Sequence, residues 1–196
     1  MSSAKTARPL TPGEIALARS VFADDIDYGQ VRIHARNYVF WQGAGYIITP
    51  NGQMYLGRRL RHYTDFSAAG IQIQAFFIHE MAHVWQHQHG VNVLCRGLGE
   101  QIRHFLGFNQ YRYRLEPGKP LTAYKLEQQG DIMRDLFLAQ LGHPTPYDAE
   151  AYVAMTGAPA RGRSIGITQL DAVDLANNVA DHPGTDGESV HKDGSQ

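Results

Sequence analysis

The sequence predicts an α+β domain in which a small β-sheet packs on a long helix, and three observations support this fold class. Apolar residues recur at helical spacing over residues 70–90, with no internal Gly or Pro. Residues 31–56 instead alternate between apolar and polar types, as half-buried strands do. A second amphipathic helical pattern covers residues 122–141.

The composition limits the classes of protein to which this chain can belong. A chain of 196 residues with 43% hydrophobic content and a net charge of −1 suits one compact domain with a real core. The near-neutral charge argues against a nucleic-acid-binding protein, which would normally carry a strong basic excess. We expect a single domain over residues 1–181 and a flexible tail, rich in Gly, Asp and Ser, over residues 182–196.

Signals for disulfide bonding, export or membrane insertion are missing from the sequence. Cys95 is the only cysteine, so the chain can form no internal disulfide. The first nine residues lack the apolar core of a signal peptide, and no segment is long and apolar enough to cross a bilayer. We therefore expect synthesis and residence in the cytoplasm, with no nucleic-acid partner and no membrane partner. Export by a signal-independent secretion system stays open.

The first predicted element is a helix from Pro12 to Phe22. Thr11 and Glu14 have the spacing of a capping box, in which each side chain accepts a hydrogen bond from the backbone of the other. Pro12 suits the first helical position. The apolar residues of this segment form a face that we expect to pack on the rest of the domain.

A sheet of three or four strands is expected next. Residues 31–35 alternate strictly between apolar and polar types, and residues 38–41 continue the pattern. Residues 45–49 and residues 53–56 are two further strand-like segments that can pair with one another. Pro50-Asn51-Gly52 between the last two segments has the composition of a hairpin turn. We expect this sheet to pack on the long helix.

A short basic run, Arg58-Arg59-Leu60-Arg61-His62, follows the predicted hairpin. Such a run could contact phosphate or an acidic substrate. A solvated connection before the long helix is the favoured interpretation.

The long helix carries the sequence H-E-M-A-H at residues 79–83. Two His residues four positions apart lie on the same face of a helix and can bind one metal ion, at about 2.0 to 2.1 Å each. Glu80 lies beside such an ion, where it can hold and deprotonate a water molecule. Charged groups on an otherwise apolar helix cost desolvation energy unless they are paired or bind metal. The pattern therefore predicts the site of a zinc hydrolase.

A third protein ligand is needed, and the sequence offers three candidates. His87 continues the stripe, but about 12 Å of helix rise separates it from His79, so it cannot bind the same ion. His89 matches the metzincin spacing H-E-x-x-H-x-x-G-x-x-H, in which a Gly breaks the helix and turns the third His back. Gln86 stands at that Gly position and favours continuation of the helix, which carries His89 away.

The third candidate lies on the second helix, which Thr122 is expected to cap. Glu127 and Asp131 are four residues apart and therefore share a face of this helix. One carboxylate would bind the metal, and the other would accept a hydrogen bond from the outer N–H of a ligating His. Gly130, between them, would allow the two helices to approach closely. A solvated acidic stripe is the alternative, so His89 and Glu127 both stay open on spacing alone.

The motif H-E-M-A-H, followed about forty residues later by E-Q-Q-G-D on a second helix, resembles the gluzincin branch of the zincin metallopeptidases. The resemblance implies a zincin-like fold and a Zn²⁺ ion bound by three ligands, His79, His83 and Glu127. It also implies that Glu80 is the general base and that Asp131 supports a His ligand. Gly130 stands where gluzincins usually carry Ala, a departure that we do not expect to harm the site.

A wider likeness covers most of residues 9–143. The runs L-T-P-G-E-I, F-I-H-E-M-A-H-V-W-Q-H-Q and L-E-P-G-K-P-L-T-A-Y-K-L-E-Q-Q resemble small bacterial proteins labelled Vgr-related or Rhs-associated, which are encoded near type VI secretion components. This resemblance implies secretion components as partners, but the labels name no activity.

Together these features predict a zinc-dependent metallohydrolase that cleaves a peptide or amide bond in a peptide or protein substrate. Such an enzyme also needs a hydrogen-bond donor for the oxyanion. Tyr124, expected one turn before Glu127 on the same helix, is our first candidate, and Tyr111 and Tyr113 stay open. The alternatives are a non-catalytic, secretion-associated binding protein with the same fold and a toxin that hydrolyses peptidoglycan peptides.

Overall fold

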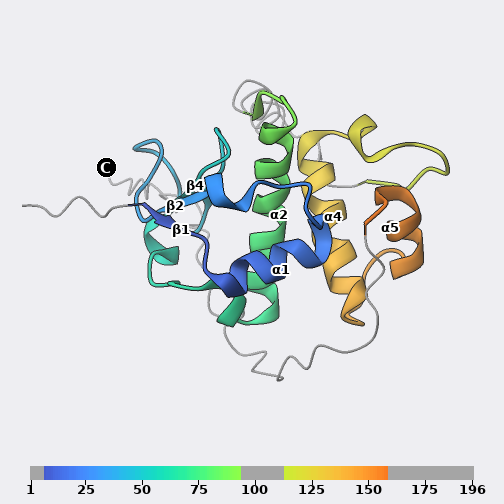
Figure 1. The fold of residues 1–196 in the computed structure, drawn as a ribbon, viewed down its shortest axis with the longest axis horizontal. Coiled ribbons are helices and arrows are strands. Elements are labelled where there is room, and N and C mark those ends of the chain that lie inside the picture. The colour runs from blue at the N-terminus through green and yellow to red at the C-terminus, as the bar shows by residue number, and fades with distance from the viewer. Residues whose placement is uncertain (1–6, 94–112, 159–196) are drawn as a thin grey trace, which may run out of the picture. The chain divides into compact units, whose positions relative to one another are not determined.

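The computed structural model describes residues 7–93 and 113–158 (Figure 1). All described residues belong to one compact unit. Cys95, Tyr111 and the predicted tail lie outside the described residues, so the expected boundaries of domain and tail stay predictions. Within the described part of the chain, no helix is long and apolar enough to span a bilayer.

The described residues combine short strands with longer helices, in the order β1, α1, β2, β3, β4, α2, α4, α5. The strands are β1 (Arg8–Pro9), β2 (Arg32–His34), β3 (Ile47–Ile48) and β4 (Met54–Leu56). The helices are α1 (Pro12–Phe22), α2 (Ile71–Gln88), α4 (Leu126–Gln140) and α5 (Ala149–Thr156). The α+β class expected from the sequence therefore agrees with the observed elements.

The strands form one sheet in the order β1-β2-β4-β3. β1 pairs antiparallel with β2, and β3 pairs antiparallel with β4, whereas β2 and β4 run parallel. The predicted hairpin is confirmed, because Ile47 pairs with Leu56 and Ile48 with Tyr55. Gly52 in its turn has a φ of 72°, a conformation that favours glycine.

The strand predicted at residues 38–41 is wrong, because these residues form a curled loop. Gln42 is buried at the centre of this loop. Its Oε1 accepts a hydrogen bond from Tyr38 N at 2.8 Å, and its Nε2 donates to Tyr46 O at 2.9 Å and to Tyr55 O at 2.8 Å. A side chain thus satisfies backbone groups that a neighbouring strand would otherwise have paired.

The helix predicted from Pro12 to Phe22 is confirmed as α1, with its capping box in place. Glu14 is fully buried and accepts hydrogen bonds from Thr11 N and Phe66 N, both at 2.9 Å. The two Nη atoms of Arg8 donate to its carboxylate at 2.8 Å. This buried, fully paired carboxylate therefore joins β1, the start of α1 and the turn that leads into α2.

Helices α2 and α4 pack side by side (Figure 1). The long helix predicted after Gly70 is confirmed as α2. α4 begins at Leu126, so the prediction that Thr122 caps it is wrong. Residues 121–123 form a 3-10 turn, and Tyr124 then has extended backbone angles, with φ −86° and ψ 161°, which interrupt the helical path. Tyr124 therefore precedes α4 instead of lying on it.

The hydrophobic core joins α1, α2 and α4 and extends to the sheet and to α5. It fixes the two helices that carry the candidate ligands. Its most deeply buried large side chains come from the sheet, the turn before α2, and helices α2, α4 and α5: Ile33, Met54, Leu56, Phe66, Phe77, Ile78, Met81, Ile132, Leu136, Phe137 and Tyr152.

Candidate metal centre

Three potential metal ligands from two helices converge at one point: His79 and His83 of α2 and Glu127 of α4. One ligand atom of each lies within 4.8 Å of the others. The Nε2 of His79 is 3.3 Å from Glu127 Oε2, and the Nε2 of His83 is 3.6 Å from Glu127 Oε1. The packing of α4 on α2 thus brings Glu127 to the pair of His residues.

Each imidazole contacts a second polar group through its Nδ1. The Nδ1 of His79 is 3.3 Å from Asp131 Oδ1, and the Nδ1 of His83 is 2.9 Å from Gln86 Oε1. Because both partner atoms are acceptors, they favour a proton on Nδ1 of each ring. In the neutral rings, the Nε2 lone pairs then face Glu127 and are available to a metal.

Gln86 is a site residue that the sequence interpretation treated only as a helix former. It is fully buried, and its Nε2 donates to Leu126 O at 3.0 Å and to Gln129 Oε1 at 2.9 Å. Gln129 Nε2 in turn donates to Tyr124 O at 2.7 Å. These amides tie His83 to the start of α4. The available signal was a Gln three residues after His83, on the same helical face.

Gly130 allows α4 to approach α2 closely, as its position between Glu127 and Asp131 predicted. A Cβ at residue 130 would lie 2.7 Å from His79 Cε1 and 2.9 Å from each ring nitrogen of His79. The imidazole therefore occupies the space that a side chain at residue 130 would fill.

A polar cluster behind Asp131 joins α4 to α5. Arg134 Nη1 lies 2.6 Å from Asp131 Oδ1, and Arg134 Nη2 lies 2.9 Å from Asp135 Oδ1. The Tyr113 hydroxyl donates to Asp135 and lies 2.7 Å from the Tyr152 hydroxyl on α5. Burial and the contact with Asp135 raise the pKa of Tyr113, so it remains a donor. Arg134 thus compensates two buried carboxylates, one of which contacts a candidate ligand.

Glu80 is buried, and the hairpin orients it. Thr49, which follows β3, donates from its Oγ1 to Glu80 Oε2 at 2.6 Å. Burial raises the pKa of Glu80, and this effect outweighs the two imidazoles and the Thr49 hydrogen bond, which lower it. A carboxylate with a raised pKa accepts a proton more readily than an ordinary one, which suits a general base.

The electrostatics of the three candidate ligands favour positive charge between them. Burial would lower the pKa of His79, but hydrogen bonds with Asp131 and Glu127 raise it to about 10. Burial would also lower the pKa of His83 and raise that of Glu127, yet contacts among the three ligands reverse both shifts. Two imidazole nitrogens and one carboxylate oxygen are a donor set of catalytic zinc sites. The residues present therefore fit a zinc ion.

The other His candidates lie apart from this group. His89 ends α2 and is exposed, with its Nδ1 2.8 Å from Trp85 O and its ring centroid 4.7 Å from that of Trp85. The helix continues through Gln86, as expected, and does not turn His89 back. His87 is exposed as well. Neither belongs to the ligand group found among the described residues.

The hydroxyls considered as oxyanion donors have other partners. The Tyr124 hydroxyl accepts from Glu116 N at 2.9 Å and donates to Arg114 O at 3.1 Å. Tyr113 donates to Asp135, and Tyr111 lies outside the described residues. The structure therefore brings together most of the predicted site but engages the Tyr124 hydroxyl with backbone.

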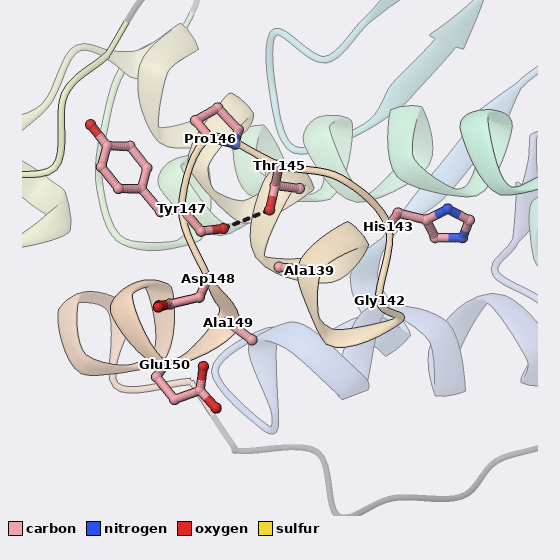
Figure 2. A pocket seen from close by; sticks show the side chains of 9 residues that line it. All are labelled: Ala139, Gly142, His143, Thr145, Pro146, Tyr147, Asp148, Ala149 and Glu150. Atoms are coloured by element: carbon pink, nitrogen blue, oxygen red, sulfur yellow. Dashed lines mark hydrogen bonds between the residues drawn. The ribbon is translucent and has the colours of Figure 1, made fainter.

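A separate surface hollow of about 540 Å³ lies between the end of α4 and the start of α5 (Figure 2). Thr145 Oγ1 donates to Tyr147 O at 2.7 Å within the loop that borders it. His143 and Glu150 point away from one another, so the hollow does not gather its ionisable groups. No candidate metal ligand lines it.

Known proteins share both the sequence and the fold. The chain is 56% identical over 135 residues to the type VI secretion system spike protein VgrG2b of Pseudomonas aeruginosa, a match that covers 69% of this chain and 13% of that protein. It is 49% identical to the solved effector domain of Pseudomonas aeruginosa VgrG2b, with a TM-score of 0.69, and the match covers 80% of this chain and 86% of that one. The chain belongs to the VgrG2b effector-domain family.

The likeness concerns one part of the spike protein. The match covers 86% of the VgrG2b effector domain but only 13% of the whole VgrG2b chain. The chain therefore spans only a small part of the length of the whole spike protein. No protein-family model matches the chain.

Proposed function

We propose that this chain is a zinc-dependent peptidase that acts as a type VI secretion effector domain. The observation that carries the proposal is the convergence of the His79 and His83 Nε2 atoms on Glu127, with buried Glu80 next to the first His. Three protein ligands leave a coordination position open, as catalytic zinc sites require, and a purely structural site has no use for the neighbouring base.

A zinc ion held by these ligands would activate water and polarise a substrate carbonyl. Glu80 is the proton acceptor in this proposal. Its buried carboxylate, next to the candidate ligand His79, is placed to take a proton on a carboxylate oxygen and pass it to the leaving amine. Thr49 holds one of its oxygens, Oε2, which leaves the other for that proton. Asp131 and Gln86 keep the two imidazoles in the required orientation.

The relatives support the delivery part of the proposal. The chain shares its family with the effector domain of a type VI secretion system spike protein. We infer that the chain leaves the cytoplasm through this signal-independent system and that secretion components are its partners. Its substrates are peptides or proteins, and the peptides of the cell wall are one class to test.

Metal content tests the ligand set. Purified parent protein, Glu127→Ala and His89→Ala would be analysed for zinc after growth with added zinc. We expect about one zinc per chain in the parent and in His89→Ala, and little in Glu127→Ala. Absence of zinc from the parent would favour a metal-free binding protein. Loss of zinc in His89→Ala alone would favour the metzincin-like set.

Hydrolysis tests the base. The parent and Glu80→Gln, both loaded with zinc, would be incubated with a mixed peptide library and with peptidoglycan fragments. We expect cleavage by the parent and retention of zinc without turnover in Glu80→Gln. Equal hydrolysis by the two proteins would remove Glu80 from the mechanism. A zinc-loaded parent that cleaves neither class would contradict the peptidase assignment.

A further inference from the structure

Three aromatic side chains are exposed on one loop of the sheet region. Phe40 is 90% exposed, Trp41 69% and Tyr46 68%. The rings of Phe40 and Trp41 meet edge to face, with centroids 4.4 Å apart. Large apolar side chains gain nothing for folding when they are left in water, and a cluster of them marks an interaction surface.

The loop that carries these aromatic residues is held in place. Gln42 is buried beneath it and bonds to backbone on both sides, as described above. Gly57 N donates to Tyr46 O at 2.9 Å, and Arg59 N donates to Ala44 O at 2.9 Å. A Cβ at Gly57 would lie 2.5 Å from the carbonyl oxygen of Ala44, so the two segments are in close contact. The loop that exposes the aromatic residues is thus fixed by hydrogen bonds to its backbone.

The sequence segment that contains this loop carries charged residues of one sign. Residues 28–64 contain five Arg and no Asp or Glu, in a chain whose net charge is −1. Arg32 donates to Gly29 O and Val31 O, and Arg61 donates to Leu56 O and the Asn37 side chain. These acceptors are neutral, so the bonds themselves do not neutralise the charges of Arg32 and Arg61.

Three of the arginines lie on the exposed side of this region. Arg36 is exposed, and its guanidinium lies 5.3 Å from the centroid of the Tyr55 ring. Arg58 and Arg59 are exposed too, and the backbone bond from Arg59 to Ala44 keeps this pair next to the aromatic loop. The backbone of the basic run found in the sequence therefore lies next to the loop that carries the aromatic residues.

We propose that this aromatic and arginine surface docks on an anionic lipid membrane. Trp and Tyr side chains favour the interfacial layer of a bilayer, and a fully exposed Phe can enter its apolar edge. Arg binds the phosphates of lipid headgroups, and each basic residue adds to the attraction of an anionic surface. The arginines favour lipid headgroups, which carry phosphate, over an uncharged wall polysaccharide.

Docking of this kind needs no membrane-spanning segment, so it departs from our expectation of no membrane partner, which was based on the lack of such segments. Tyr46 leads through β3 to Thr49, whose hydroxyl bonds to Glu80. The same hairpin therefore connects the docking surface to the candidate metal centre. Membrane binding itself does not depend on the proposed hydrolysis and can be measured in a Glu80→Gln protein.

Co-sedimentation with vesicles tests the proposal. Full-length protein would be mixed with phosphatidylglycerol vesicles and with phosphatidylcholine vesicles at low and high salt. We expect binding to the anionic vesicles only, weakened by salt because surface charges are screened. Replacement of Phe40 and Trp41 together by Ser should abolish binding. Arg58→Glu should weaken it at least about fivefold, whereas the matched control Arg114→Glu, outside the surface, should bind as the parent does.

Tryptophan fluorescence supplies an independent measurement. Trp41 and Trp85 are the only two tryptophans, so a Trp85→Phe protein reports on Trp41 alone. We expect a blue shift of its emission, and quenching by brominated lipid, when anionic vesicles are added. Equal binding to both vesicle types, binding unchanged in the double Ser variant, or an unshifted Trp41 emission would each overturn the proposal. Binding to isolated peptidoglycan instead of vesicles, lost in the same variants, would also overturn it in favour of a wall polymer.

Discussion

Gly130 of α4 lies against the imidazole of His79 of α2, so closely that a Cβ at residue 130 would come 2.7 Å from His79 Cε1. Two helices thus meet at the point where one of them offers a candidate metal ligand. The absence of a side chain at residue 130 lets the same helix present Glu127 to His79 Nε2 and Asp131 to His79 Nδ1.

Gly130→Ala should therefore displace His79 and lower zinc affinity. Overpacking costs about 1 to 3 kcal/mol, and the better helix propensity of Ala offsets about 1 kcal/mol of it. We expect little change in thermal stability but a loss of zinc affinity of about tenfold or more, measured by competition with a chelator. Gly45→Ala, which adds a methyl group in open space, is the control. Parental zinc affinity in Gly130→Ala would show that His79 adjusts freely.

Gln86 can be tested through two substitutions that remove different bonds. Gln86→Leu removes the acceptor for His83 and the donor to Leu126 O and Gln129. Gln86→Glu keeps an acceptor for His83 and loses only the donor. Each buried group left unpaired costs about 1 to 3 kcal/mol, so both variants should unfold at lower denaturant concentration.

The two Gln86 variants should differ in zinc binding. We expect Gln86→Leu to lose about ten- to a hundredfold in zinc affinity, because His83 is no longer held through its Nδ1. Gln86→Glu should stay closer to the parent. Equal losses of affinity in the two variants would mean that Gln86 acts on the site only through the packing of α4.

Arg134 should contribute to stability through the two carboxylates that it compensates. Asp131 and Asp135 are both buried, but the Arg134 side chain is 37% exposed, so solvent screens part of the interaction. Arg134→Met should lower the free energy of unfolding by about 1 to 3 kcal/mol. The control is Arg19→Met, whose partner Asp24 has a side chain that is 88% exposed and where the expected loss is under about 1 kcal/mol. Equal losses would contradict a special role for the cluster.

Thr49→Val removes one hydrogen bond to the proposed base while it keeps the shape of the side chain. Zinc content should be unchanged, because Thr49 contacts Glu80 and none of the three ligands in the described bonds. Turnover should fall about tenfold, with a smaller effect on KM, because Glu80 loses its fixed orientation. An equal fall in zinc content and turnover would point to general damage of the site.

The parts of the fold that the sequence predicted rest on interactions between close neighbours in the chain. The capping box of Thr11 and Glu14, the helical period before Gly90 and the turn at Gly52 are all local. The strand at residues 38–41 was wrong because Gln42, whose bonds curl that loop, reaches as far as Tyr55. A periodic pattern does not report such side-chain bonds to distant backbone.

The candidate site, too, has a part that local spacing predicted and a part that depends on the fold. His79, Glu80 and His83 follow from the spacing on one helix, whereas the choice of Glu127 over His89 depends on how α4 packs against α2. Thr49 was missed because 31 residues separate it from Glu80, and only the fold brings them together. The contacts that orient a site therefore depend on packing, which spacing in one sequence does not contain.

The buried Glu14 also determines how the domain responds to a mechanical pull at its N-terminal end. Tension applied at Arg8 reaches α1 along the backbone and, in parallel, through the ion pair between Arg8 and Glu14. The bond from Phe66 N to Glu14 passes part of that tension to the turn before α2. Force on β1 is therefore shared by the neighbouring α1 and by the distant turn before α2, and β1 is not held by its pairing with β2 alone.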